Sequence, residues 1–299
     1  MINKELKQEI VSLKVLHDIV ETYEEIAAMR MRKIKSSVLV NRSFLNELNQ
    51  VYIDVENNKQ VNVAKKVLIK QLEALKNLMY DKKLYILLSA NAGLYGAVVR
   101  DTIRNFITDI KDQDCDVIII GKIGKGYYEK EQKKHKYIYF DYSDDVVDEV
   151  KAADLLKEIV KYKEVVIYYG LFKDILTQIP QKSVLSHGTI EKHKREVLDE
   201  DKRQVVSLGN SSERKKYLLE PSSEALLDFF EKEVMRLLFI QYLYESNLSK
   251  FASRMINLDY AIVNVNNRLK QMNYIRLKNK HRLADSKQQN VLSGISLWS

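Results

Sequence analysis

Residues 237–272 read LLFIQYLYESNLSKFASRMINLDYAIVNVNNRLKQM and carry a regular apolar repeat. Steps taken alternately by four and three residues from Leu237 meet a mostly apolar series. The series is Leu237, Gln241, Tyr244, Leu248, Phe251, Met255, Leu258, Ile262, Val265, Leu269 and Met272. A mean spacing of 3.5 residues is typical of a helix that supercoils with a partner helix. The stretch therefore predicts one arm of a coiled coil.

The N-terminal region carries the same pattern. From Leu6, the same steps reach Ile10, Leu13, His17, Val20, Glu24, Ala27, Met31, Ile34, Val38, Asn41, Leu45, Leu48 and Tyr52. His17, Glu24 and Asn41 are the polar members, and a polar group in such a seam lowers stability but can fix the register. At 1.5 Å per residue, this arm would be roughly 80 Å long.

The positions of glycine and proline support two long helices. The first 92 residues contain neither residue type, and neither do the 72 residues from Ser222 to Ser293. Because Gly and Pro are the strongest local breaks in regular structure, these stretches predict uninterrupted arms. Two arms from opposite chain ends most simply pair antiparallel. An ordinary helical bundle is the alternative, but the repeat persists far beyond the average globular helix of about 10–14 residues.

The middle of the chain alternates apolar runs with amphipathic segments. The runs predict strands at Leu84–Leu88, Asp116–Gly121, Tyr137–Phe140 and Lys163–Tyr169, and an edge strand at Ser183–Ile190. The amphipathic segments predict helices at about Tyr95–Lys111 and Asp144–Tyr162. Alternation of this kind indicates a parallel sheet. The predicted fold class is α/β. The N- and C-terminal helices (1–58 and 217–299) form a long antiparallel coiled coil, and the residues between them (59–216) form a central Rossmann-like α/β domain.

Composition limits the classes of function. Charged residues make up 30% of the chain, above the ~25% typical of globular domains, as exposed helices require. The net charge is +8, but the 49 basic and 41 acidic residues are largely interspersed, which disfavours a dedicated nucleic-acid surface. The one cysteine, Cys115, excludes an intramolecular disulfide and lies between two aspartates, which disfavours a reactive thiolate. No apolar run approaches the ~20 residues needed to span a bilayer.

Three local patterns suggest binding chemistry without meeting its requirements. Gly121–Gly126 follows a strand but matches no phosphate-binding loop, and a turn between strand and helix is favoured. Asp112, Asp114 and Asp116 alternate like the start of a calcium loop, but its later glycine and glutamate are missing. The histidines offer no tetrahedral metal set: His187 and His193 lie in a polar stretch, and His17 and His281 lie in the arms. No catalytic, cofactor-binding or metal-binding residue is therefore predicted.

Several motifs resemble one family, the gamma subunit of F-type rotary ATP synthases. Glu220–Asp228 (EPSSEALLD) resembles its E-P-x-x-E-x-L-L-D signature, and Glu245–Met255 continues the likeness in register. Ile26–Lys33 is similar to the V-A-A-x-K-L-R-R segment of its first helix. Weaker likenesses lie at Ser89–Gly96, Gly121–Tyr128 and Val165–Phe172. Together they cover nearly the whole chain in the family's order.

The departures from the family pattern lie mainly on surfaces that the resemblance assigns to partners. Asn91-Ala92 replaces an acidic-basic pair, and Ala97 replaces a glycine. Tyr23-Glu24-Glu25 replaces a methionine-basic-methionine run and reverses its charge. Near the C-terminus, Lys280-His281 replaces Arg-Gln, and Lys287 and Asn290 replace glutamates. These substitutions indicate a divergent member whose partners have changed with it.

The resemblance implies a rotor shaft that makes and breaks no bonds itself and needs no cofactor. Its partners would be a hexamer of alpha and beta ATPase subunits around a single copy of the coiled coil, an epsilon-like subunit, and a membrane ring or other output module. The complex would be cytoplasmic and peripheral at the inner face of the cell membrane. The implied contacts to the ring are Arg30, Arg32, Lys33, Lys278, Lys280, His281, Val291, Leu292, Ile295, Leu297 and Trp298.

Two alternatives remain open from the sequence. One is the rotor of a paralogous ATPase whose output is not ion transport, such as gliding machinery. The other is a coiled-coil organiser of nucleic acid, although no basic aromatic surface is visible. The sequence alone does not distinguish ATP synthesis from hydrolysis.

Overall fold

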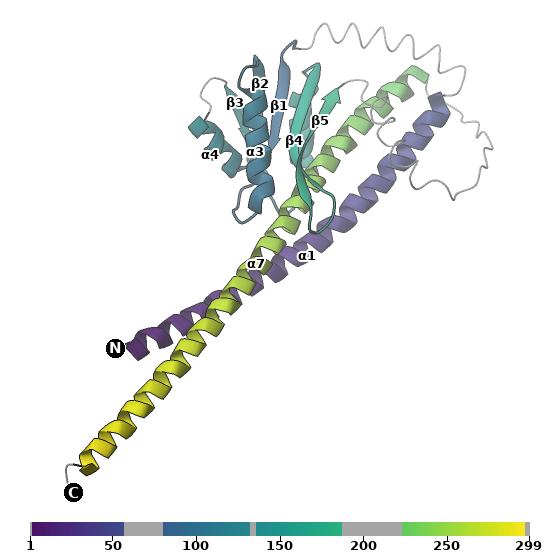
Figure 1. The fold of residues 1–299 in the computed structure, drawn as a ribbon. Coiled ribbons are helices and arrows are strands. Elements are labelled where there is room, and N and C mark those ends of the chain that lie inside the picture. Colours follow the sequence, from purple (N-terminus) through teal and green to yellow (C-terminus); the bar gives the residue numbers. More distant parts are fainter. Residues whose placement is uncertain (1, 57–79, 132–135, 187–222, 297–299) are drawn as a thin grey trace. The chain divides into compact units, whose positions relative to one another are not determined.

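The computed structural model describes residues 2–56, 80–131, 136–186 and 223–296 (Figure 1). These residues form two compact units, which are described separately below. Unit 1 comprises Met1–Met29 and Arg254–Ser299, and unit 2 comprises Arg30–Ser253. The predicted domain boundaries near residues 58 and 216 lie outside the described residues. Within the described ranges, no helix contains an apolar stretch of the length and hydropathy that a bilayer span requires.

Both predicted arms are single helices. Helix α1 spans Ile2–Glu56 and helix α7 spans Ser223–Ser296. Within unit 1 the two helices run antiparallel, because Glu9 pairs with Arg268 at 3.3 Å while Glu24, further along α1, lies near Asp259, earlier on α7. The predicted seam is buried at many positions: Ile10, Ala27, Met31, Ile34, Val38 and Leu45 on α1, and Leu248, Phe251, Leu258 and Met272 on α7. The coiled-coil prediction is confirmed.

Unit 2 holds the predicted central sheet (Figure 1). Its strands are β1 (Lys83–Leu88), β2 (Cys115–Ile120), β3 (Tyr137–Phe140), β4 (Glu164–Phe172) and β5 (Gln178–Ser186). The order β3-β2-β1-β4-β5 is parallel except for β5, which pairs antiparallel with β4. The connecting helices are α3 (Gly96–Ile110), α4 (Lys122–Glu131) and α5 (Glu149–Ile159). The four parallel strands have the order 3-2-1-4, which is the first part of the Rossmann strand order, in agreement with the predicted Rossmann-like domain.

Several predicted boundaries were wrong, among them the end of β4, which reaches Phe172 rather than Tyr169. The edge strand is Gln178–Ser186 rather than Ser183–Ile190, because a tight turn at Asp174 returns the chain at once along β4; residues 187–190 lie outside the described residues. Helix α5 begins at Glu149 rather than Asp144, because Asp148 caps it by accepting from two backbone N–H groups. The predicted turn at Gly121–Gly126 is only Gly121, with φ +98°, and Gly124 and Gly126 lie inside α4.

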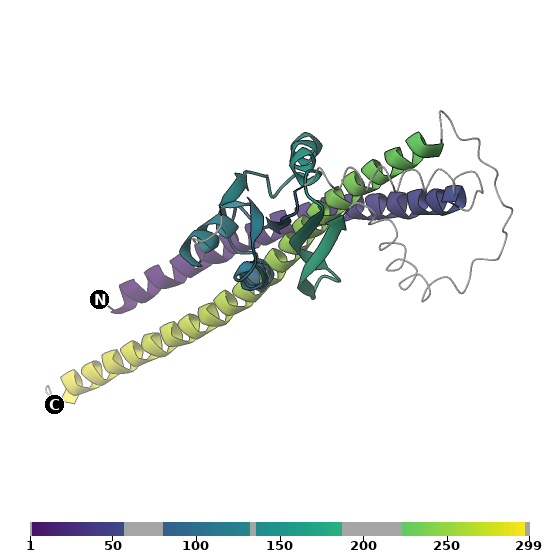
Figure 2. The ribbon, with the colours of Figure 1, turned by 90° about the horizontal axis from the view of Figure 1, so that it is seen from above.

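Helices cover both faces of the sheet in unit 2 (Figure 2). On one face, alternate strand residues such as Ile86, Ile118 and Ile167 form a core with α5 and with residues 234–243 of α7. On the other face, Phe106 of α3 contacts Tyr168 of β4 edge to face, with ring centroids 5.4 Å apart. Helix α7 therefore belongs to the core of the α/β unit as well as to the coiled coil.

Candidate functional site

The residues implied as ring contacts lie in two groups on the long helices. Arg30, Arg32 and Lys33 are on α1 in unit 2, and Lys278, Lys280, His281, Val291 and Leu292 are on α7 in unit 1. Ile295 lies on α7, but its side chain is not described, and Leu297 and Trp298 lie outside the described residues. No measurement of the structure tests a partner contact, so these assignments stay predictions.

The C-terminal end of α7 is a bare helix among the described residues. From Tyr274 to Ser293 every residue is exposed except Asn279, which is half-buried. Val291 and Leu292 are 62% and 66% exposed. From Arg268 to Lys287, with both ends counted, the helix carries seven Lys or Arg residues and one acidic residue, Asp285. This part of α7 is exposed on all sides, is basic and carries several large apolar side chains. These properties suit a partner that encloses the helix and has an acidic lining.

Arg30 is held inside unit 2. Its guanidinium pairs with the carboxylate of Asp145, which follows β3, and lies over the ring of Phe251 on α7, 5.8 Å from the centroid. Because Arg30 lies on α1, it joins both long helices to the sheet. Lys33, one helical turn further along, is exposed.

A buried ion pair holds α7 against the carboxyl end of the sheet. The Nζ of Lys250 donates to Oδ1 of Asp144 at 2.9 Å and to the carbonyl oxygen of Ser89 at 3.0 Å. Oδ2 of Asp144 accepts from the backbone N–H groups of Asn91 and Ala92 at 2.7 and 3.1 Å and from the Tyr95 hydroxyl at 3.3 Å. We call Lys250, Asp144 and the loop Ser89–Tyr95 the clamp. A charge-assisted network of this kind fixes the orientation of the groups it joins.

The clamp fills the position where other sheets of this topology bind a ligand. In an open parallel sheet, ligands enter the crevice at the carboxyl ends of the strands where the chain order reverses, here between β1 and β4. Lys250 reaches the residue that follows β1, and its neighbour Ser249 abuts Gly170 of β4. A Cβ added to Gly170 would lie 2.7 Å from the Ser249 Oγ. The crevice is therefore occupied by α7.

A second polar contact joins α1 to α7 in unit 2. The Nε of Arg42 donates to Oε1 of the buried Glu245 at 2.9 Å, and Gln241 donates to the same oxygen at 2.7 Å. Asn41, a polar seam member, donates from Nδ2 to Oε1 of Gln241 at 2.7 Å. These directional bonds fix the register of the two helices, as expected for polar seam positions.

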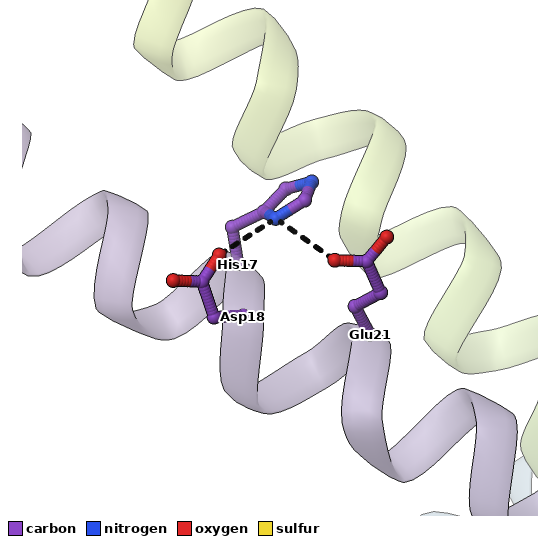
Figure 3. A group of neighbouring side chains, drawn as sticks. All are labelled: His17, Asp18 and Glu21. Atoms are coloured by element: carbon purple, nitrogen blue, oxygen red, sulfur yellow. Dashed lines mark hydrogen bonds and ion pairs between the residues drawn. The ribbon is translucent and has the colours of Figure 1, made fainter.

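His17, another polar seam member, lies in unit 1 between two carboxylates (Figure 3). Its Nδ1 is 3.4 Å from Oδ1 of Asp18 and 3.7 Å from Oε2 of Glu21. The ligand atoms of the three residues lie within 4.8 Å of one another, but Asp18 and Glu21 are exposed. We assign this group no metal, because exposed carboxylates commonly gather in this way without one.

Sequence reasoning missed the clamp. Lys250 interrupts an apolar helical stretch, and a lysine among residues as apolar as Leu248 and Phe251 is a signal for a buried counter-charge. Its partner could not be identified, because Asp144 is 106 residues away in a loop with four other acidic or polar neighbours.

Comparisons with known proteins agree over nearly the whole chain. The model of the ATP synthase family matches residues 3–285. The ATP synthase gamma chain of Halothermothrix orenii is 24% identical over 273 residues, covering 87% of this chain and 86% of that protein. The gamma chain of Histophilus somni is 22% identical over 298 residues, covering 97% of both. The chain belongs to the ATP synthase gamma-chain family.

Solved structures of ATP synthase rotors and central stalks share the fold. The rotor of the Euglena gracilis mitochondrial ATP synthase matches with a TM-score of 0.61 and 18% identity, over 94% of this chain and 98% of that one. The Tetrahymena thermophila mitochondrial central stalk matches with a TM-score of 0.56 and 17% identity, over 81% and 99%. The resemblance found from the motifs is confirmed. The chain is a central-stalk subunit of a rotary ATPase, and the matches favour neither a nucleic-acid organiser nor a rotor with another output.

Proposed function

We propose that this gamma chain turns inside a hexamer of alpha and beta subunits and couples ATP hydrolysis or synthesis there to rotation. The catalytic groups would belong to the hexamer, and the chain itself would make and break no bonds. One shaft inside a ring with threefold repetition presents a different face to each catalytic interface. It therefore biases each interface toward a different conformation, as differential binding to states requires.

The bare end of α7 is the observation that carries this proposal. Lys278, Lys280 and His281 would meet acidic loops of the ring, and the apolar residues Val291, Leu292, Ile295, Leu297 and Trp298 would form the bearing at its top. In isolation, exposed apolar residues along a helix lower solubility, so an enclosing partner accounts for them. Arg32 and Lys33 would extend the basic contact on α1, while Arg30 would serve mainly to join the helices to the sheet.

Unit 2 would carry the output. The similar Euglena and Tetrahymena chains come from assemblies whose names include a c-ring. By analogy, we propose that unit 2 meets an epsilon-like subunit and a membrane ring, with one gamma chain per hexamer. The complex would then be peripheral at the inner face of the membrane.

Affinity purification of the tagged full-length chain from its own cells tests the proposal. We expect alpha and beta subunits to co-purify in threefold excess over the chain, together with ATPase activity. Recovery of the chain without an ATPase hexamer would contradict the proposal.

A matched pair of charge reversals then tests the tip. Lys280→Glu lies on the bare end of α7, and Lys130→Glu lies on an exposed site of α4. We expect Lys280→Glu to lower the rate or the torque of rotation under load, while Lys130→Glu leaves both unchanged. Equal effects of the two substitutions would remove the assigned role of the tip.

A further inference from the structure

The outer face of α1 in unit 1 carries an apolar stripe. Its members recur every fourth residue, so they align along one side of the helix. The stripe consists of Val11, Val15, Ile19 and Tyr23, and their exposed fractions lie between 48% and 54%. They lie on a different side of α1 from the seam that faces α7. Two seam residues, Ile10 and Ala27, are buried. We call this set the outer stripe; α7 does not cover it.

An acidic band accompanies the outer stripe. Between Lys14 and Arg30, α1 contains four carboxylates and no Lys or Arg, and between Arg254 and Arg268, α7 contains one carboxylate and no Lys or Arg. The five residues are Asp18, Glu21, Glu24, Glu25 and Asp259, and we call them the acidic waist. In a chain with net charge +8, a net charge of −5 over these two facing segments stands out.

The acidic waist is not neutralised within unit 1. Among the described residues, no Lys or Arg forms an ion pair with any of its five carboxylates; only His17 lies near Asp18 and Glu21 (Figure 3). Partial burial and the charges of Asp259, Glu21 and Glu25 raise the pKa of Glu24. The chain alone therefore bears a repulsion that a cationic partner would relieve.

We propose that the outer stripe and the acidic waist form an interaction surface for a basic amphipathic segment of the alpha or beta subunits. Such a segment offers aliphatic side chains to the outer stripe and Lys or Arg side chains to Asp18, Glu21 and Glu25. This proposal rests on the proposed function. Under this proposal the shaft presents regions of both signs of charge to the ring. The basic tip on α7 requires acidic groups in the ring, and the acidic waist requires basic groups that face α1.

This pattern of positive and negative charge determines which ring binds the shaft. Opposite charges steer association, and like charges facing one another cost affinity. A ring that carries only acidic groups along the path of the shaft would repel the acidic waist. The proposal therefore identifies Glu21, Glu25 and Asp18 as specificity-determining residues.

Site-directed crosslinking in the purified complex tests the proposal. A photoreactive p-benzoylphenylalanine replaces Ile19 in the outer stripe in one variant and Lys280 at the tip in another. We expect the probe at position 19 to attach to an alpha or beta peptide with more Lys and Arg than Asp and Glu. Three outcomes would overturn the inference and leave the proposed function unaffected. The probe at position 19 could attach to an acidic or neutral peptide, or to another protein. It could also fail to attach while the probe at position 280 reacts with the ring. Failure of alpha and beta to co-purify would overturn both.

Matched charge reversals give an independent readout. Glu25→Lys lies in the acidic waist, and Glu5→Lys lies on the same helix outside it; both side chains are exposed. We expect Glu25→Lys to weaken assembly with the hexamer about tenfold at low salt, and less at about 0.5 M salt because screening shortens the reach of charges. Glu5→Lys should change assembly by less than about twofold. Unchanged or tighter assembly of Glu25→Lys would overturn the inference.

Discussion

The ammonium group of Lys250 lies 2.9 Å from the carboxylate of Asp144, and each side chain is only 7% exposed. Lys250 lies on the shaft helix and Asp144 on a loop of the sheet, 106 residues earlier. Burial of two charges costs solvation free energy, which their attraction offsets only with good geometry and further hydrogen bonds. The clamp supplies those bonds through Ser89, Asn91, Ala92 and Tyr95. The α/β unit is thereby attached to the helix that would transmit torque.

The two sides of this ion pair should differ in their contribution to stability. Asp144→Ala leaves a buried ammonium without its counter-charge and removes the acceptor of two backbone N–H groups, so we expect a loss of about 3–5 kcal/mol in the free energy of unfolding. Lys250→Met leaves Asp144 with its three Oδ2 donors and should cost about 2 kcal/mol. Urea denaturation followed by circular dichroism measures both. The exposed pair Lys157–Asp154 on α5 provides the control, since Lys157→Met should cost less than about 0.5 kcal/mol. Equal losses for Asp144→Ala and Lys250→Met would contradict this account of the clamp.

The regular elements could be predicted from sequence because their signals are local. The 3.5-residue repeat predicted α1 and α7, and apolar runs such as the one in Asp116–Gly121 predicted the strands. The predicted start of α5 was wrong, because the amphipathic pattern cannot distinguish an aspartate inside a helix from an N-cap aspartate such as Asp148. The clamp could not be predicted because it depends on which loop the fold brings to Lys250. The burial of α7 on several sides near Phe239 was also missed, since a heptad repeat describes contact with one partner helix only.

Two glycines of α4 form a matched pair for a test of packing. A Cβ on Gly124 would lie 2.6 Å from the Ser89 Cβ, whereas a Cβ on Gly126 would meet nothing within 4 Å. We expect Gly124→Ala to lower the free energy of unfolding by about 1–3 kcal/mol through overpacking against the clamp loop. Gly126→Ala should raise it by about 0.4–1 kcal/mol, because alanine restricts the unfolded chain and favours the helix. Thermal and urea unfolding of the two variants give the comparison. A lower free energy of unfolding for both variants would indicate that the lack of space beside Ser89 does not cause the destabilisation.

The single thiol should report on unfolding. Cys115 is buried at the start of β2, and burial together with the charges of Asp116 and Asp114 raises its pKa to about 11. Since the thiolate is the reactive form, a disulfide reagent at pH 8 should modify the native chain slowly and the urea-unfolded chain rapidly. The ratio of the two rates follows from absorbance at fixed reagent concentration. Comparable rates in both states would show that β2 opens without global unfolding.

The acidic waist should make unit 1 respond to pH through Glu24. Partial burial, then Asp259, Glu21 and Glu25, raise the pKa of Glu24 in the folded state, so its ionised form is less favourable there than in the unfolded chain. The proton-bound form therefore stabilises the fold at low pH, and this stabilisation is lost as the pH rises through the raised pKa. Glu24→Gln should raise the melting temperature of the isolated chain by about 1 °C at pH 7, and the gain should vanish as the pH falls below the pKa of Glu24. Glu5→Gln, outside the waist, is the control and should show no such gain. A lower melting temperature for Glu24→Gln at pH 7 would mean that the carboxylate is satisfied in the free chain and would remove the repulsion from the argument for a basic partner.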